Sequence, residues 1–400
     1  SIHMELVFCA KLNASFGISF LLNNNIKINI MNLSYWEYKT WLSNIDFTIV
    51  GSGIVGLNCA LQLRKRHPKA KILVLEKGLL PQGASTKNAG FACFGSISEI
   101  LSDLKTHSEE EVLQLVQDRW DGVAALRQNL GATVMDLQVY GGHELFLKED
   151  KSLYEQCITE LDNVNELLEP VFGDAAFEVK PNYFKFKGIE QNYISQCFEG
   201  QVDTGKMMQG LLQKVNSEGI RILNGITVTS FQDNPNGVTI ETSEFTLSSK
   251  KLCIAVNGFA TDLIQENVKP ARAQVIITKP IKNLGIKGTF HLQEGYYYFR
   301  NIHDRILLGG GRNLDFSAEE TTKFGTTKLV QDKLTEILKE VILHDTPFEI
   351  DYAWSGIMGM GEQKKPIVKL LSNNVACGVR LGGMGIAIGT TVGRQLAGTF

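Results

Sequence analysis

The chain has 400 residues, of which 44% are hydrophobic and 21% charged, and its formal net charge is −3 at pH 7. This length allows two domains with a sizeable buried core. A nearly neutral chain without a long Lys/Arg block argues against non-specific binding to nucleic acid, because that binding depends on neutralising phosphates.

Residues 1–44 are expected to be an N-terminal extension of the first domain. The apolar run "FGISFLL" is too short to span a membrane, and the Asn-rich stretch that follows it lacks the small-residue cleavage site of a signal peptide. Met31 is a plausible natural start, because the chain runs directly from it into the first predicted strand. We therefore treat residues 1–30 as a cloning remnant or a mis-assigned start and give them no functional role.

The segment 45–76 has the pattern of a β-α-β unit. An apolar strand, "IDFTIV" (45–50), is followed by helical spacing of apolar residues over 54–66 and by a second strand, "KILVLE" (71–76). The motif GxGxxG lies between the first strand and the helix, at Gly51-Ser52-Gly53-Ile54-Val55-Gly56. This context predicts dinucleotide binding, whereas a glycine-containing turn without a ligand is the alternative.

Each glycine of this motif has its own expected purpose. Gly51 permits the tight turn, Gly53 lets the backbone approach a pyrophosphate, and Gly56 lets the helix pack closely on the strand. The free N–H groups at the start of the helix favour phosphate oxygens. Glu76 ends the second strand, where an acidic side chain binds the hydroxyl groups of a ribose.

The remaining elements alternate between helical and strand-like patterns. The predicted helices are 97–128, 151–169, 204–217, roughly 317–344 and 386–398. Strand-like stretches lie near 133–149 and 176–187, from "IRIL" (220–223) to "KLCIAV" (251–256), over 271–312, and at 374–379. This order predicts an α/β fold with mixed α and β character, in which a discontinuous Rossmann-like domain accompanies a mixed β-sheet domain with helices.

The stretch after the second strand favours FAD over NAD as the dinucleotide. The segment "GASTKNAGFACFGS" (83–96) is small, polar and rich in glycine, which suits packing against a flat polar ring system. A nicotinamide-dependent dehydrogenase also needs its own proton-handling group, and no His/Asp or Tyr/Lys constellation presents itself. A flavin brings its own reactivity, so the protein has only to bind and orient it.

The run from "FTIVGSGIVG" through "VLEKG" to "GASTKNAGF" resembles the FAD-dependent D-amino acid oxidase superfamily, in its glycine oxidase, sarcosine oxidase and glutamylputrescine oxidase-like branch. The resemblance covers nearly everything from residue 45 onward, and it recurs at 200–212, 251–263, 305–316, 352–368 and 375–397. It implies an FAD-binding domain of residues 45–100, 200–265 and 350–400, and a substrate domain of residues 101–199 and 266–349. The FAD is expected to be non-covalent, because "SGIMGMGEQ" lacks the cysteine that tethers the flavin in the sarcosine oxidase branch.

The resemblance also implies which residues hold the FAD. The ADP half would lie at the glycine motif and Glu76, the pyrophosphate and the flavin edge at the next loop, the adenine at the backbone of Val228, and the flavin pyrimidine at the C-terminal glycine turn. A helix that begins at this last turn would direct N–H groups toward the flavin N1/C2=O edge. The residues assigned to FAD in this way are Gly51, Gly53, Ile54, Val55, Gly56, Glu76, Lys77, Ser85, Asn88, Ala89, Gly90, Val228, Asn257, Gly258, Gly383, Met384, Gly385 and Ile386.

Two tyrosines are candidates for contact with the substrate. In the strand "EGYYYFR" (294–300), alternation places Tyr296, Tyr298 and Arg300 on one face, and Tyr297 and Phe299 on the other. In the enzymes that the chain resembles, a tyrosine here often touches the substrate, so Tyr296 and Tyr298 are predicted to do so. Aromatic packing between strands is the alternative.

Arg380 is predicted to bind a substrate carboxylate, with a structural ion pair as the alternative. In the glycine oxidase-like branch, the carboxylate-binding arginine follows a Trp-x-Gly segment, but here Met358 lies about where it would fall and is interpreted as pocket wall or core. Either Arg380 takes this role or the substrate is not a simple amino acid. Arg312 and Arg272 are interpreted as structural, although Arg312 is able to face the pocket.

The cysteines and histidines carry no predicted chemistry. The seven cysteines form no CxxC pair, and no histidine lies in an HExxH motif, so the sequence predicts neither disulfides nor a metal site, and it favours a reducing, cytoplasmic location. His291 and His303 flank the tyrosine-rich strand and are able to approach the pocket, but they are interpreted as surface or structural residues.

The predicted reaction is oxidation of the C–N bond of a small amine or amino acid by hydride transfer to flavin N5, giving an imine and reduced flavin. Either O₂ or an electron carrier would reoxidise the flavin, and no nucleic acid partner or transmembrane segment is expected. One alternative is a 2-hydroxy acid dehydrogenase, which would need a basic histidine near the flavin. Others are a flavoenzyme that trims a wobble-uridine side chain of tRNA and a flavin-binding protein without activity.

Overall fold

A computed structural model describes residues 33–400, and the expectations for residues 1–30 lie outside this range. The described chain begins with a short helical segment, α2 (Tyr35–Glu37), which continues as a π-helix (Tyr38–Leu42). Ser34 and Glu37 form a reciprocal capping box at its start. Leu42 is buried against the first strand, so this segment is attached to the core of the first domain.

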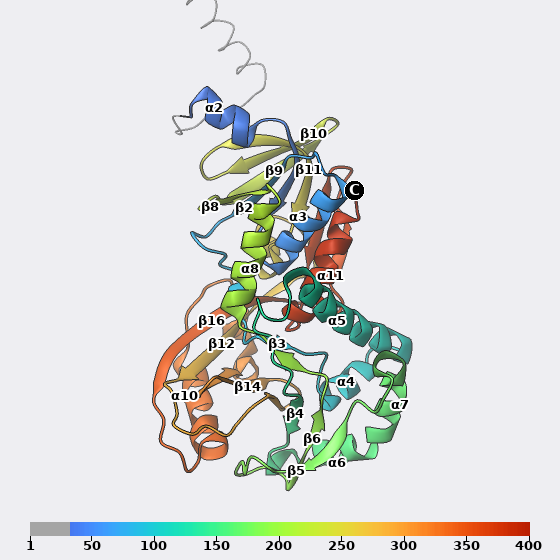
Figure 1. Cartoon of the computed structure of the whole chain (residues 1–400), viewed down its shortest axis with the longest axis vertical. Coiled ribbons are helices and arrows are strands. Elements are labelled where there is room, and N and C mark those ends of the chain that lie inside the picture. Colours follow the sequence, from blue (N-terminus) through green and yellow to red (C-terminus); the bar gives the residue numbers. More distant parts are fainter. Residues whose placement is uncertain (1–32) are drawn as a thin grey trace, which may run out of the picture.

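Residues 33–400 form two eight-stranded sheets, which occupy the upper and lower halves of the molecule in Figure 1. The first sheet has the order β17-β18-β11-β1-β2-β8, and the β9–β10 hairpin extends it through β11. Strands β18, β11, β1, β2 and β8 run parallel. Its strands are β1 (Ile45–Val50), β2 (Ile72–Glu76), β8 (Arg221–Asn224), β9 (Val228–Asn234), β10 (Gly237–Thr242), β11 (Thr246–Ile254), β17 (Ile367–Leu370) and β18 (Val375–Val379).

The parallel strands are apolar on both faces because both faces are covered. Alternate residues such as Ile49 and Val74 pack against a helical layer, and their neighbours Val50 and Leu75 pack toward the β9–β10 hairpin. The helices of this layer are α3 (Ile54–Arg66), α8 (Thr204–Ser217) and α11 (Gly385–Ala397). Gly393 lets α11 approach α3, since a Cβ there would lie 2.6 Å from the carbonyl oxygen of Val55.

The second sheet has the order β16-β12-β15-β14-β13-β4-β6-β5, and only the β13–β4 pair within it is parallel. One face packs on α10 (Lys328–Ile337) and the π-helix Leu338–Ile342, while the other face turns toward the first domain. Its strands are β4 (Gly142–Leu145), β5 (Glu178–Pro181), β6 (Asn192–Gln196), β12 (Lys269–Thr278), β13 (Thr289–Leu292), β14 (Tyr297–Ile302), β15 (Arg305–Gly310) and β16 (Ile350–Met360).

A group of helices joins the two sheets. It consists of α4 (Ile97–Leu104), α5 (Glu109–Leu130), α6 (Lys151–Thr159) and α7 (Leu161–Phe172), at the lower right of Figure 1. Helix α5 packs directly on α11, where Gly122 leaves no room for a side chain beside the backbone of Ala387. The smaller pair β3 (Phe91–Ala92) and β7 (Gly200–Gln201) lies beside the second sheet, where the side chain of Gln201 donates to Asn301 of β14.

The predicted mixed α/β fold is confirmed, and several elements differ in detail. The helix over 204–217 is found at these bounds. The helical stretch 97–128 consists of two helices, and the second begins after its cap Ser108, where "SEEEV" (108–112) predicts a helix start. The long helix near 317–344 is divided into α9 (Phe316–Glu319), α10 and a π-helix. Among the described helices, none is both long and apolar enough to cross a bilayer.

The proposed domain division differs from sheet membership at one boundary. The family resemblance implies that residues 350–400 belong to the FAD-binding domain, whereas β16 (350–360) pairs along its length with β12 and is part of the second sheet. The chain returns to the first sheet only at β17. The reason is that β16 and β12 form a long antiparallel pair, which the sequence pattern of either strand alone does not reveal.

Candidate active site

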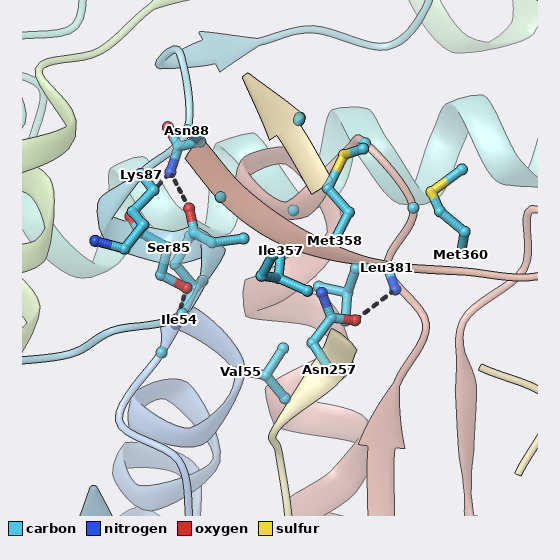
Figure 2. A pocket seen from close by; sticks show the side chains of 18 of the residues that line it. Ile54, Val55, Ser85, Lys87, Asn88, Asn257, Ile357, Met358, Met360 and Leu381 are labelled. Atoms are coloured by element: carbon cyan, nitrogen blue, oxygen red, sulfur yellow. Dashed lines mark hydrogen bonds between the residues drawn. The ribbon is translucent and has the colours of Figure 1, made fainter. Parts of the chain in front are cut away.

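A cavity of about 650 Å³ lies between the carboxyl ends of β1, β2 and β11 and the inner face of the second sheet. Both glycine turns line it, one at residues 51–53 and the other at residues 382–385. Figure 2 shows this region, with Ile54 and Ser85 at one side and Leu381 and Asn257 at the other. Segments more than 300 residues apart in the chain therefore contribute to a single cavity.

The first glycine turn is formed as the motif predicts. Gly51 has a φ of +103°, and a Cβ there would lie 2.6 Å from the carbonyl oxygen of Ala255. A Cβ on Gly56 would overlap the carbonyl oxygen of Gly51, so this glycine serves packing. At Gly53, the close approach is to the hydroxyl of Ser85, which accepts a 2.9 Å hydrogen bond from the N–H of Ile54. Ser85 thus satisfies the first free N–H of α3.

Glu76 is held rigidly beside this turn. Its Oε2 accepts hydrogen bonds from the N–H of Ser52 (3.1 Å) and from its hydroxyl (2.8 Å), and Oε1 accepts one from the N–H of Gly78 (2.9 Å). The side chain is buried and lines the cavity. The carboxylate is therefore fixed in place by its own chain, with acceptor capacity left for a ribose hydroxyl.

The loop after β2 is fixed from both domains. Asn88 donates to the carbonyls of Ala84 and Ser85, and its Oδ1 accepts from the N–H of Gly90 and the hydroxyl of Thr204. The buried Arg300 donates to the carbonyls of Gly90 (3.0 Å) and Val202 (2.9 Å). Burial lowers the pKa of Arg300 to about 10, so it stays charged at neutral pH.

The C-terminal turn presents an open helix start to the cavity. Helix α11 has no side-chain cap at its N-terminus, and a Cβ added at Gly382, Gly383 or Gly385 would meet no atom within 4 Å. The first N–H groups of a helix have no intrahelical acceptor, and they favour negatively charged or polar oxygens. Asn257 Oδ1 holds the turn by accepting from the N–H groups of Arg380 and Leu381.

The structure brings most of the predicted cofactor and substrate residues to the cavity. Four do not line it, namely Gly56, Gly90, Gly258 and Arg380, and the three glycines serve close packing of the backbone around it. Those that line it are Gly51, Gly53, Ile54, Val55, Glu76, Lys77, Ser85, Asn88, Ala89, Val228, Asn257, Tyr296, Tyr298, Met358, Gly383, Met384, Gly385 and Ile386.

Arg380 is directed away from the cavity. Its Nε donates to the carbonyl of Lys365 at 2.9 Å, and its Nη1 approaches the carbonyl of Asn267 at 3.4 Å. Its backbone has a φ of +66°, the left-handed conformation that carries the chain into the glycine turn. The guanidinium thus stabilises the loop before α11, and this geometry does not support the predicted carboxylate role.

The substrate side of the cavity is built on the second sheet. His291 and Tyr298 are directly paired across β13 and β14, and the ring of Tyr298 lies over Gly309 of β15, where a Cβ would lie 2.5 Å from it. The hydroxyl of Tyr298 has no hydrogen-bond partner in residues 33–400. Burial raises the pKa of Tyr298 to about 12, so the hydroxyl remains a donor. The predicted alternation is also found, with Tyr297 and Phe299 in the core on the opposite face.

Met358 and Met360 form an apolar part of the wall at the end of β16 (Figure 2). Both lie at alternate positions of one strand and therefore on the same face. Together with Ala273 and Val275 of the neighbouring β12, they line the cavity with side chains that carry no charge. Met358, which the sequence indicates to be pocket wall or core, lies in the wall of the cavity.

His291 lines the cavity and was missed as a site residue. Its Nε2 lies 3.2 Å from Glu199 Oε2, and its Nδ1 lies 3.7 Å from Glu99 Oε2. Burial alone would lower the pKa of His291, but the charges of Glu199, Glu99 and Glu144 outweigh it and raise the pKa to about 9. His291 is therefore an imidazolium at neutral pH. The described part of the chain gathers no group of side chains arranged to hold a metal ion.

Arg312 also lines the cavity, although its sequence context indicated a structural residue. It follows β15 after one intervening residue, Gly311, in the segment "GGGRN". The only signal for its role was this position at the end of a strand next to a glycine turn. Whether the side chain faces the cavity depends on the backbone conformation of the turn, which the sequence alone leaves open.

These features fit a flavin dinucleotide. The cavity extends from Val228, the expected adenine contact, past Glu76 and the start of α3, to the open start of α11 and then to Tyr298. Its volume lies within the usual range for cofactor pockets, and two helix starts face it, as an anionic pyrophosphate and an electron-accepting ring require.

Known proteins share this sequence pattern and fold. The family model described as DAO, FAD dependent oxidoreductase, matches residues 46–399. A protein named probable oxidoreductase OrdL, from Rhizobium meliloti (strain 1021), is 22% identical over 371 residues, which cover 88% of this chain and 82% of that protein.

Solved structures are similar over most of the chain. Glycine oxidase from Bacillus cereus ATCC 14579 superposes with a TM-score of 0.71 at 15% identity, over 89% of this chain and 96% of that one. L-proline dehydrogenase from P. horikoshii superposes with a TM-score of 0.70 at 16% identity, over 88% and 92% respectively. At these identities the likeness concerns the fold.

Proposed function

Because the chain belongs to the DAO family of FAD-dependent oxidoreductases, we propose that it oxidises the C–N bond of a small amine or amino acid, with transfer of a hydride to flavin N5 and formation of an imine. The resemblance found in the sequence and the FAD cofactor are thereby confirmed at the level of the family. The names of the two similar structures, a glycine oxidase and an L-proline dehydrogenase, support an amino acid as substrate.

The observation that carries this proposal is the ion pairing of His291. Among residues 33–400 it is the histidine that lines the cavity, and it lies between the carboxylates of Glu199 and Glu99. An imidazolium held in this way does not accept a further proton. Oxidation of a hydroxy acid needs a base for the hydroxyl proton, whereas a neutral amine loses hydride without one. The site therefore favours C–N over C–O oxidation.

The residues of the chain have separate tasks in this reaction. The bound FAD supplies the hydride acceptor. The Tyr298 hydroxyl is a free donor that orients the substrate, and Met358 and Met360 exclude water from that side of the cavity. The open start of α11 places N–H dipoles where negative charge is to be stabilised.

A 2-hydroxy acid dehydrogenase is the second candidate, since a histidine does line the cavity. It becomes the better interpretation only if ligand binding separates His291 from one of its glutamates and lowers the pKa of the imidazole. The two candidates differ in substrate, in product and in the expected pH dependence, so a single set of anaerobic measurements distinguishes them.

The test is anaerobic reduction of the FAD-loaded protein by panels of amines, amino acids and 2-hydroxy acids. We expect members of the first two panels to bleach the flavin absorbance near ~450 nm, because the cofactor carries the chemistry. Hydrolysis of the imine should release a carbonyl product in proportion to the flavin reduced. Bleaching by hydroxy acids alone would favour the second candidate, and bleaching by no member of any panel would refute both.

A further inference from the structure

Arg312 occupies a fixed place at the edge of the substrate side. It begins a short 3₁₀ turn (Arg312–Leu314) directly after β15. Gly311 before it has a φ of +82°, and its N–H donates to the carbonyl of Tyr296 at 3.0 Å. The left-handed glycine redirects the chain from the strand, and the hydrogen bond ties the turn to the start of β14. The backbone of Arg312 is thus anchored next to Tyr296 and Tyr298.

The guanidinium of Arg312 is held by two aromatic rings. Its central carbon lies 5.5 Å from the ring centroid of Tyr296 and 5.2 Å from that of Phe316, and these two rings lie 6.0 Å apart. Aromatic faces attract a cation and fix its plane, but they do not neutralise its charge. Within residues 33–400, the guanidinium forms no ion pair and donates no hydrogen bond. All of its N–H donors therefore remain available to a ligand.

Other positively charged side chains that line the cavity already have partners in the protein or lie on its nucleotide side. Arg119 donates to the carbonyl of Phe94 at 2.6 Å and faces Asp103. Lys364 pairs with the same carboxylate, Asp103, at 2.5 Å. Lys77 adjoins Glu76 on the nucleotide side, with its ammonium 3.7 Å from the ring of Phe259.

Lys87 is the remaining competitor, since its ammonium lies 5.2 Å from the ring of Phe324 and forms no ion pair within the described residues. An ammonium, however, acts as a point charge, whereas a guanidinium presents parallel N–H groups that match both oxygens of a carboxylate. Among the described residues that line the cavity, Arg312 therefore has the chemistry and the free donors for carboxylate binding.

We propose that Arg312 binds the carboxylate of the substrate, and that the enzyme therefore acts on an amino acid rather than on a simple amine. This rests on the proposed C–N oxidation. Two parallel N–H···O bonds fix both the position and the orientation of the carboxylate. The nearby hydroxyl of Tyr298 is a free donor, so the two residues together orient the carbon that loses hydride. Arg312 takes the role that the sequence suggested for Arg380.

The first test measures ligand binding without turnover. Benzoate and acetate are titrated into the FAD-loaded protein, and the dissociation constant is read from the perturbation of the flavin absorbance. R312M should raise this constant about 10- to 100-fold, as expected for the loss of hydrogen bonds between charged groups, and R312K should raise it less. R305M is the matched control, because Arg305 begins the same strand but pairs with Asp351 outside the cavity, and it should leave the constant unchanged.

The second test separates the carboxylate site from the reaction. An amino acid and the amine left by removing its carboxylate, such as proline and pyrrolidine, are compared in anaerobic flavin reduction. R312M should raise KM for the amino acid far more than it lowers kcat, and it should bring this KM toward that of the amine, which lacks the carboxylate.

The outcomes distinguish this inference from the proposed function. Arg312 is not the anchor if the wild-type protein binds neither benzoate nor acetate, or if R312M binds them as tightly as wild type does. The same conclusion follows if K87M, instead of R312M, weakens the binding of these carboxylates. If R312M impairs amino acid and amine equally, the anchor is also refuted while C–N oxidation stands. If no amine or amino acid reduces the flavin but carboxylate binding depends on Arg312, the proposed function fails and the carboxylate site remains.

Discussion

His291 and Tyr298 face each other across β13 and β14, and both line the same cavity. The ring of Phe91 makes edge-to-face contacts with both, at centroid distances of 5.4 Å and 5.6 Å. One member of the pair is an imidazolium bound by two carboxylates, and the other carries a hydroxyl without a partner among the described residues. His291 therefore has a positive charge that is held in place by the protein, whereas Tyr298 next to it has a hydroxyl that is free to donate to a ligand.

Replacing Tyr298 by phenylalanine tests this free donor. Because the hydroxyl makes no hydrogen bond within the described protein, Y298F should change the free energy of unfolding by less than about 0.5 kcal/mol. The loss of one hydrogen bond to the substrate should lower kcat/KM about 3- to 10-fold. Urea unfolding and steady-state kinetics measure the two effects. Unchanged kcat/KM would show that the hydroxyl does not touch the substrate.

His291 should make the stability of the protein depend on pH. Its pKa is about 9 in the folded state and about 6.5 when unfolded, so the stabilisation is fully present below pH 6.5 and is lost as pH rises to about 9. The charged groups that face it are Glu99, Glu199 and Glu144. The full effect is on the order of 3 kcal/mol.

The difference in unfolding free energy between wild type and H291Q measures the stabilisation that the charged His291 contributes. We expect the difference to be largest near pH 6 and to shrink steadily to pH 9.5. Burial raises the pKa of Glu144 to about 7, which lowers the stability of wild type and H291Q alike between about pH 4.5 and 7, so the difference between them isolates His291. A difference that does not vary with pH would mean that His291 is neutral in the folded protein.

Glu76 should be required for retention of FAD. E76Q removes the negative charge that accepts hydrogen bonds from Ser52 and Gly78 and weakens the proposed contact with the ribose. We expect the dissociation constant of FAD to rise about 10- to 100-fold. Titration of the FAD-free protein with FAD gives this constant. E244Q, at an exposed position of the same domain, is the control, and equal retention by E76Q would remove Glu76 from the ribose site.

Gly393 should tolerate no side chain. Alanine normally stabilises a helix by up to about 1 kcal/mol over glycine, but here the added carbon would lie 2.6 Å from the Val55 carbonyl, so G393A should destabilise the protein by about 1–3 kcal/mol. The exposed Gly205 of α8 is the control, because its nearest atom is a flexible Asp203 oxygen at 3.3 Å. If urea unfolding shows a gain for G393A, the close contact between α3 and α11 is incorrect.

For Arg380 the sequence and the structure predict different roles: the sequence predicts carboxylate binding, and the structure indicates that the side chain stabilises a loop. Since its guanidinium ties the loop before α11 to the backbone carbonyls of Lys365 and Asn267, R380M should lower the free energy of unfolding by about 1–3 kcal/mol and leave KM for an amino acid unchanged. Chemical denaturation and kinetics give the two quantities. A raised KM with unchanged stability would restore the carboxylate role predicted from the sequence.

Much of the cofactor-binding side of the cavity can be predicted from local sequence patterns. The order strand, glycine turn, helix and acidic strand end is a property of neighbouring residues, and Gly51, Gly53 and Glu76 line the cavity as this order implies. The alternation of Tyr296 to Arg300 is equally local, because side chains of a strand point to opposite faces in turn. Both patterns can be recognised in the sequence because they depend on residues that are close together in the chain.

On the substrate side of the cavity, the charge and direction of the side chains depend on contacts between segments that are distant in the chain. His291 is charged only because Glu199 and Glu99 reach it from other elements, and Arg312 faces the cavity because Gly311 turns left-handed and two rings hold the guanidinium. Arg380 precedes the predicted turn as expected, yet its side chain points away from the cavity. The sequence by itself thus determined the family, the cofactor and the turns that face it. Only the tertiary structure decided which charged side chains face the substrate, because their direction depends on backbone conformation and on partners far away in the chain.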